Sequence, residues 1–275
     1  MLNISIKKLE IKSNKKKLLN LSFDILDSTA LIGESGSGKS LTLKALLNLL
    51  PSSLEIEKDI KSNFEFDYNS IGFIPQNPFT SLSMMTKIGD QFFCNNEKKE
   101  EVLKLVDLDI NVLKKFPSQL SGGQIQRVVI AIALSRDIKL LLLDEPTTAL
   151  DEENKNNIIK LINEIKQQLN ILILFVTHDI YSIKNICKNI IILKNGEIIE
   201  QGLTNNILFS PKEDYTKRLI NSTFKDKTFM LYFSAESWYI PNSINVDADL
   251  TDIEKSNIVL LNQYIATAND VYKEI

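Results

Sequence analysis

The sequence is poor in the residues that build disulfide frameworks and metal centres. Its 275 residues include two cysteines and one histidine. Cys94 and Cys187 stand far apart with no C-x-x-C pattern, as is typical of a protein from a reducing cytosol. We therefore expect both to be ordinary core or surface thiols that provide no metal site.

Long apolar runs and an excess of positive charge are also absent. No apolar run approaches the roughly 18 residues of a membrane span, and no charged-then-apolar signal opens the chain. We therefore expect a protein that neither spans a membrane nor is exported. The net charge of −3 and the pI of about 5.5 predict no nucleic-acid partner, because a phosphate backbone selects basic surfaces.

Residues 33–40 (GESGSGKS) fit the pattern G-x-x-x-x-G-K-[ST] of phosphate-binding loops. They lie between an apolar run at 30–32 and a helix expected at 40–50, a context that a chance Gly/Ser turn would lack. In such a loop, backbone N–H groups converge on phosphate oxygens at a helix N-terminus. Lys39 can reach the β- and γ-phosphates, and the Ser40 hydroxyl suits a Mg²⁺ ligand. The predicted nucleotide-binding residues are Gly33, Glu34, Ser35, Gly36, Ser37, Gly38, Lys39 and Ser40.

Two acidic residues follow a buried strand predicted at 140–143. Four leucines in a row are typical of a strand that is buried on both faces of a parallel sheet. Asp144 and Glu145 then emerge at its carboxyl end, where ligands of α/β sheets bind. Asp144 is placed to hold Mg²⁺, and Glu145 to orient and polarise the water that attacks the γ-phosphate. Without the phosphate loop upstream, we would interpret both as solvated strand-end residues.

A second glycine-rich segment, LSGGQ at 120–124, precedes a helix predicted at 124–135. Ser121, Gly122 and Gly123 can form a second phosphate-binding nest at its start. Two nests in one chain favour a two-fold dimer, in which the second nest of one protomer closes over the nucleotide of its partner. The same letters would also suit an ordinary helix-preceding turn, but their place just before the 140–143 strand favours the phosphate interpretation.

The order of these three segments resembles the ATP-binding cassette (ABC) family, and the resemblance covers roughly residues 1–222. It implies an α/β fold of the P-loop NTPase cassette type, with a mixed sheet core, an antiparallel β subdomain and a helical lobe at about 88–136. It also implies hydrolysis of ATP with Mg²⁺, with Lys39 and Glu145 among the catalytic residues and Gln124 at the nucleotide.

Three further residues match smaller motifs of the same family. Gln76 (IPQNP) matches the glutamine that approaches Mg²⁺ and signals to a transmembrane partner. Asp151 (TALD) matches the loop that contacts the opposing protomer. His178 (VTHD) matches a switch histidine on the γ-phosphate, although a lone histidine after a strand is more often a satisfied polar residue. The resemblance thus implies Gln76 at both nucleotide and metal, Asp151 at the nucleotide, and a catalytic His178.

Within the family, the chain most resembles ATPase subunits of dipeptide, oligopeptide and nickel importers, over residues 33–51, 74–91, 116–127 and 209–220. This implies a peripheral protein at the cytoplasmic face of the cell membrane. Its partners would be membrane permeases, a second ATP-binding subunit, identical or paralogous, and indirectly an extracytoplasmic solute-binding protein.

The sequence departs from that resemblance in two ways, which concern the contact with adenine and the identity of the transported solute. No aromatic precedes Phe23 to stack on adenine, so the base would rest on Ile11 or on the stem of Lys12. No cysteine cluster follows the cassette, which favours the shorter, nickel-type members.

The match ends before a C-terminal segment, residues 223–275. Residues 229–240 are strand-like, and Thr251 and Glu254 form a capping box that opens an amphipathic helix. We expect a strand-plus-helix appendage that serves either as structural cover or as a regulatory element.

Two functions of different class stay open. The first is the ATPase of a multi-subunit importer, and the second is a soluble ABC ATPase that remodels a ribosome or DNA. Tandem cassettes or a long coiled-coil insertion would favour the second, and this chain has neither. A catalytically idle cassette would need a damaged Glu145 or His178, and both are intact.

Overall fold

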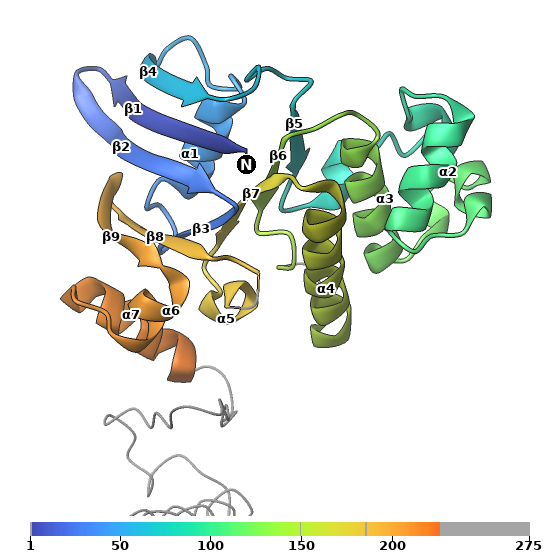
Figure 1. The fold of residues 1–275 in the computed structure, drawn as a ribbon. Coiled ribbons are helices and arrows are strands. Elements are labelled where there is room, and N and C mark those ends of the chain that lie inside the picture. Colours follow the sequence, from blue (N-terminus) through green and yellow to red (C-terminus); the bar gives the residue numbers. More distant parts are fainter. Residues whose placement is uncertain (1, 149, 185, 226–275) are drawn as a thin grey trace, which may run out of the picture. The chain divides into compact units, whose positions relative to one another are not determined.

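Five neighbouring strands carry the unbroken apolar runs of the sequence. The structure is a computed structural model that describes residues 2–148, 150–184 and 186–225. The five strands lie in parallel in the order β8-β3-β7-β6-β5 (Figure 1). Nearly all their side chains are buried, because successive residues point to opposite faces and both faces are covered. Their bounds are β3 (Ser28–Ile32), β5 (Ile71–Ile74), β6 (Leu140–Asp144), β7 (Leu172–Thr177) and β8 (Asn189–Lys194).

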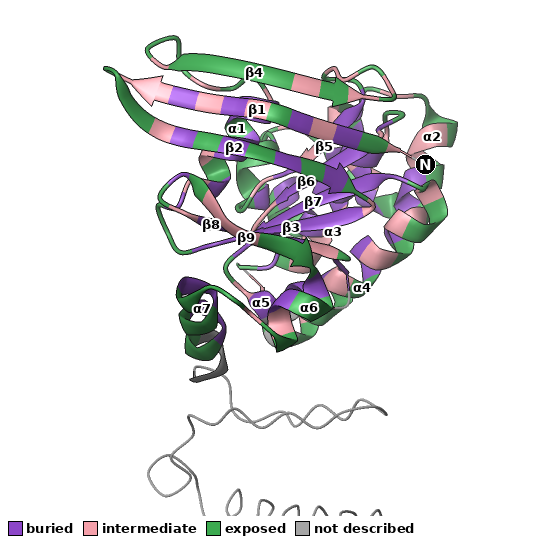
Figure 2. Cartoon of the chain, turned by 60° about the vertical axis from the view of Figure 1, so that its left-hand side comes forward, coloured by how far each residue is buried: buried purple, intermediate pink, exposed green. Residues whose placement is uncertain are grey.

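The two faces of this parallel part pack against different elements. Leu140 and Leu142 pack on the side of α1 (Lys39–Leu46) and the antiparallel strands. Leu141 and Leu143 pack on the side of α3 (Gly122–Leu134) and α4 (Glu152–Leu169). The buried strands between these layers are purple in Figure 2.

Four strands extend the sheet in the order β4-β1-β2-β9, next to β8. They are β1 (Asn3–Ser13), β2 (Lys16–Leu26), β4 (Glu55–Ser62) and β9 (Glu197–Leu203). Two tight turns join antiparallel neighbours in this sheet. The β1–β2 turn has positive φ at Asn14 and Lys15, and the β8–β9 turn has φ of 50° at Asn195 and 79° at Gly196, as a type I′ turn requires.

Strand β4 was not expected from the sequence. Its letters, EIEKDIKS, are mostly charged, and most of its side chains are exposed (Figure 2). It forms because it pairs with β1 at the edge of the sheet, where charged residues also discourage pairing with other chains.

Residues 88–116 of the expected helical lobe contain little α-helix. This segment consists of one helix, α2 (Asn96–Leu105), between the 3₁₀ turns η2 (Ile88–Gln91) and η3 (Ile110–Lys114). Side chains of Asn95 and Asp109 accept backbone N–H groups at the starts of α2 and η3, and the left-handed Asp107 follows the end of α2. The turns η1 (Pro78–Ser81) and η4 (Pro117–Gln119) complete the lobe with α3.

Two predicted helix boundaries were wrong. α1 ends at Leu46 rather than before Pro51, because the left-handed Asn48 (φ 58°) already turns the chain. α3 begins at Gly122 rather than at Gln124, since Ser121 is its N-cap.

Three short or terminal helices follow β7: α5 (Ile180–Ile183), α6 (Thr204–Phe209) and α7 (Asp214–Lys225). The expected strand and helix at 229–275 lie outside the described residues, and the domain boundary at 222/223 stays a prediction. Within the described residues, no helix combines the length and hydropathy needed to cross a membrane.

Candidate nucleotide site

The phosphate loop, defined as residues 33–38, connects β3 in the middle of the sheet to the start of α1. Gly36 and Gly38 have φ of 80° and 112°, a region that other residues rarely adopt. A side chain at Gly33 would come within 2.2 Å of the carbonyl oxygen of Leu193. The path of the loop therefore requires glycine at these three positions.

Lys39 opens α1 and turns its side chain back into the loop. Its Nζ donates hydrogen bonds to the carbonyl oxygens of Gly33 (2.7 Å) and Glu34 (3.0 Å). Burial lowers the pKa of Lys39, and the charges of Glu145 and Asp144 act in the opposite direction. A cation held at a helix N-terminus beside a glycine-rich loop is suited to bind phosphate.

Ser40 and Asp144 bring two oxygen donors together beside this loop. The Ser40 hydroxyl lies 3.4 Å from Oδ1 of Asp144, which ends β6. Burial and the adjacent Glu145 raise the pKa of Asp144, although Ser40 and Lys39 act in the opposite direction. Hydroxyl and carboxylate oxygens are the ligands that Mg²⁺ prefers, so the pair fits that ion.

Glu145 lies at the middle of a group of polar side chains at the carboxyl ends of the strands. Its Oε1 is 3.0 Å from Nδ1 of His178. Its Oε2 accepts hydrogen bonds from Oγ1 of Thr148 (3.0 Å) and Nε2 of Gln76 (3.4 Å). The backbone of Glu145 is left-handed (φ 46°), and its N–H donates to the carbonyl of Val176 in the next strand at 2.8 Å.

Thr148 is a member of this group that the sequence analysis missed. It follows Glu145 by three residues in a turn in which the Thr148 N–H also bonds the Glu145 carbonyl at 3.2 Å. The sequence did offer a signal for Thr148, namely a hydroxyl side chain three residues after the candidate general base Glu145. The structure thus brings Gln76, Glu145 and His178 together beside the phosphate loop and adds Thr148.

The remaining predicted residues form a second group at the starts of α3 and α4. Ser121 and Gln124 form a reciprocal capping box, with distances of 3.3 Å and 3.1 Å. Asp151 caps α4 through Asn154, whose hydrogen bonds lower the pKa of Asp151. A side chain at Gly123 would lie 2.9 Å from Oδ1 of Asn154, so the two helix starts adjoin. The start of α3 carries the small, exposed residues Ser121 and Gly122, which are suited to a phosphate of another chain.

The expected adenine contact at Ile11 is wrong. Ile11 faces the core and has no exposed surface, because alternation along β1 points it inward. Lys12, the next residue, is partly exposed and forms an ion pair with Glu10. It stays the candidate for contact with the base.

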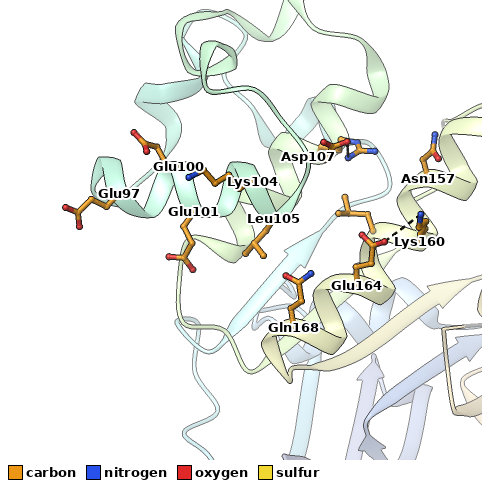
Figure 3. A pocket seen from close by; sticks show the side chains of 12 residues that line it. Glu97, Glu100, Glu101, Lys104, Leu105, Asp107, Asn157, Lys160, Glu164 and Gln168 are labelled. Atoms are coloured by element: carbon orange, nitrogen blue, oxygen red, sulfur yellow. Dashed lines mark hydrogen bonds and ion pairs between the residues drawn. The ribbon is translucent and has the colours of Figure 1, made fainter.

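A surface cavity of about 810 Å³ between α2 and α4 includes none of the predicted nucleotide-binding residues (Figure 3). Its charges partly pair, as in the ion pair of Lys160 with Glu164 at 3.9 Å. Acidic side chains outnumber basic ones in its lining, so it would repel a triphosphate. Its charged residues are Glu97, Glu100, Glu101, Lys104, Asp107, Arg127, Lys160 and Glu164.

Several known proteins are similar to this chain over most of its length. A family model described as ABC transporter matches residues 17–148. The oligopeptide transport ATP-binding protein AppD of Bacillus subtilis is 36% identical over 224 residues, which cover 71% of this chain and 68% of that protein. The nickel import system ATP-binding protein NikD of Staphylococcus aureus (strain USA300) is 36% identical over 245 residues, 79% of this chain and 94% of that protein. The chain belongs to the ABC transporter family.

Solved structures share the fold of this ABC protein. CbiO1 from Clostridium perfringens, described as part of the ABC transporter complex cbiONQ, has a TM-score of 0.65 at 26% identity and covers 81% of this chain and 96% of its own. An ATP-binding subunit of an ABC transporter has a TM-score of 0.64 at 22% identity over 80% of this chain and 99% of its own. The predicted α/β cassette is confirmed, and the family assigns ATP binding and ATPase activity to the chain.

Proposed function

We propose that this ABC ATPase is the ATP-hydrolysing subunit of a multi-subunit importer for nickel or for di- and oligopeptides, and that it drives separate membrane permeases. The observation that carries the proposal is the convergence of Gln76, Glu145 and His178 beside the phosphate loop. Support comes also from the nickel and oligopeptide relatives, which match most of the chain.

The chemistry follows from the positions of the side chains. The triphosphate of ATP lies along residues 33–40, where Lys39 neutralises its charge. Ser40, Asp144 and Gln76 would hold Mg²⁺, which when bound offsets further phosphate charge. Glu145 accepts a proton from the attacking water, and His178 contacts the γ-phosphate while it holds one carboxylate oxygen of Glu145.

The second group supports a nucleotide shared between two protomers. Ser121, Gly122, Gly123 and Gln124 of one protomer would close over the γ-phosphate bound to the partner, and Asp151 would lie at the same interface. The partner is an identical or paralogous ATP-binding subunit.

An exposed apolar surface on the helical lobe supports docking to a permease. We call Phe79, Met84, Met85, Phe93 and Phe116 the lobe patch. Met85 is 88% and Phe93 95% exposed. The loops that carry these residues are joined, because Gln91 bonds the backbone of Ser83 and Thr86, and the Ile88 N–H donates to the Lys115 carbonyl. Exposed apolar patches of this kind mark interaction sites.

We further propose that the protein sits at the cytoplasmic face of the cell membrane, beside a helix of the permease. The extracytoplasmic solute-binding protein acts on it only indirectly, through the permeases. The remodelling of a ribosome or DNA finds no support among the relatives described above.

The test is co-expression with the permeases encoded beside its gene. The chain alone should bind Mg-ATP and hydrolyse it slowly, whereas co-expression should move it to the membrane fraction and raise its rate. Glu145→Gln should move to the membrane in the same way without the gain in rate. If the wild-type chain stays in the cytosol with an unchanged rate, the importer proposal fails.

A further inference from the structure

Two hydrogen bonds connect the phosphate loop to segments that come much later in the sequence. The Gly196 N–H, in the β8–β9 turn, donates to the Ser37 carbonyl at 2.8 Å. The Glu34 N–H donates to the hydroxyl oxygen of Tyr215, on α7, at 3.3 Å. Tyr215 lies 181 residues after Glu34 in the sequence. It belongs to none of the motifs that predicted the nucleotide site.

Tyr215 is held firmly enough to fix a backbone group. It is 7% exposed, and Nζ of Lys194 lies 4.7 Å from the centre of its ring. Glu200 of β9 accepts backbone N–H groups of Lys212 (2.9 Å) and Glu213 (3.2 Å), which fixes the chain as it enters α7. Burial raises the pKa of Tyr215, so the side chain stays a neutral phenol at physiological pH.

The peptide group held by Tyr215 is connected directly to Lys39. The Glu34 N–H donates to Tyr215, and the Glu34 carbonyl accepts from Nζ of Lys39 at 3.0 Å. A fixed Glu34 carbonyl gives the ammonium group of Lys39 a fixed hydrogen-bond partner within the loop. The direction in which Lys39 presents its remaining N–H groups therefore depends on where Glu34 lies.

We propose that Tyr215 is a positioning residue for ATP binding, which acts through Glu34 to orient Lys39 toward the phosphates. The proposal rests on the proposed function of the phosphate loop. It makes the ATP affinity depend on α7, the last described helix before residues 226–275.

Tyr215→Phe tests this with the smallest change, because it removes only the hydroxyl and leaves the ring and its contact with Lys194. We expect the Kd and KM for ATP to rise about three- to tenfold, the effect of one net hydrogen bond, with kcat unchanged within about twofold. The kcat should hold because the phosphates are bound in both the ground state and the transition state. Tyr68→Phe is the matched control, since Tyr68 is 77% exposed. It should leave all three constants unchanged.

Backbone hydrogen exchange separates positioning from packing. In Tyr215→Phe, the amide of Glu34 should exchange faster than in the wild type, while the thermal midpoint without nucleotide stays within about 2 °C. An unchanged Kd for ATP in Tyr215→Phe would overturn the inference, even if the thermal midpoint were lowered while Glu34 exchange stayed normal. A wild-type chain that does not bind ATP would instead overturn the proposed function on which the inference rests.

Discussion

Nδ1 of His178 and Oε1 of Glu145 lie 3.0 Å apart, although 33 residues separate them in the sequence. The two residues follow neighbouring strands, β6 and β7, and the Glu145 N–H donates to Val176 in β7. The left-handed backbone of Glu145 is thus held by the strand that presents His178. The carboxylate is oriented by contacts within the chain itself, as electrostatic catalysis requires.

Glu145→Gln should retain ATP binding and reduce the turnover number by about two or more orders of magnitude, because a general base is lost. It should also trap the ATP-bound dimer, which size-exclusion chromatography with ATP would detect. Glu65→Gln, at an exposed acidic residue, is the control and should hydrolyse ATP normally. Hydrolysis by Glu145→Gln at a near-normal rate would place the base elsewhere.

Thr148→Val should lower kcat by about three- to tenfold with little change in KM. Valine has the shape of threonine but cannot donate to Oε2 of Glu145, so one hydrogen bond that orients the carboxylate is lost. Steady-state kinetics would measure this effect, which should be smaller than that of Glu145→Gln. A wild-type kcat would show that Thr148 has no part in orienting the base.

GTP should compete with ATP within about tenfold, since only about one stacking contact with the base is missing. Ile11 is buried, and the exposed chain near the end of β1 is rich in lysine rather than aromatic residues. Competition of both nucleotides against a fluorescent ATP analogue would measure the ratio. A strong preference for ATP would require a base contact other than Lys12.

Phe93→Ser should reduce co-purification with the permeases by roughly tenfold or more, because it removes a large apolar side chain from the lobe patch. The ATPase rate of the isolated subunit should not change, since Phe93 is 95% exposed. Leu49→Ser, at an exposed leucine outside the lobe, is the matched control and should co-purify normally. Equal co-purification of both variants would exclude the patch as the docking surface.

Asp27→Asn should lower the free energy of unfolding at pH 7 by about 1–3 kcal/mol. Burial acts to raise the pKa of Asp27, but hydrogen bonds from Lys166 and Lys188 outweigh it, and the pKa lies below its ordinary value of 3.8. Asparagine also adopts the left-handed backbone of this position (φ 57°), so the variant tests the charge.

The direction of the pKa shift of Asp27 determines how its contribution to the free energy of unfolding depends on pH. A lowered pKa in the folded state stabilises above pH 3.8, and this contribution is lost as the pH falls through the folded-state value. The difference in unfolding free energy between wild type and Asp27→Asn should therefore shrink below about pH 4. Urea denaturation at pH 7 and at pH 3 would measure it. A difference independent of pH would rule out the charge as its source.

The parts of the site that were predictable are those encoded by neighbouring residues. Apolar runs that end in glycine or in an acidic residue located β3 and β6, because these patterns follow from backbone geometry alone. The apolar residues of α4 likewise recur at helical spacing, a pattern that the sequence shows directly.

The parts that could not be predicted depend on contacts between distant segments. Strand β4 has only two apolar residues, Ile56 and Ile60, and forms because β1 offers it an edge. The contact of Tyr215 with Glu34 joins residues 181 positions apart, and no local pattern announces it. The side chain of Ile11 points inward because of the register of β1. The sequence alone does not distinguish this register from one shifted by a single residue, which would point Ile11 outward.

The place of β3 in the sheet has a consequence for synthesis on the ribosome. β3 carries the phosphate loop, yet both strands that pair with it, β7 and β8, are made roughly 140 or more residues later. At bacterial or eukaryotic elongation rates this delay is on the order of ten seconds. During that time β3 is an apolar strand with two unpaired edges. β3 gains both of its neighbours only after β8, which ends at Lys194, has left the exit tunnel, so early protection of β3 must come from other contacts or from chaperones.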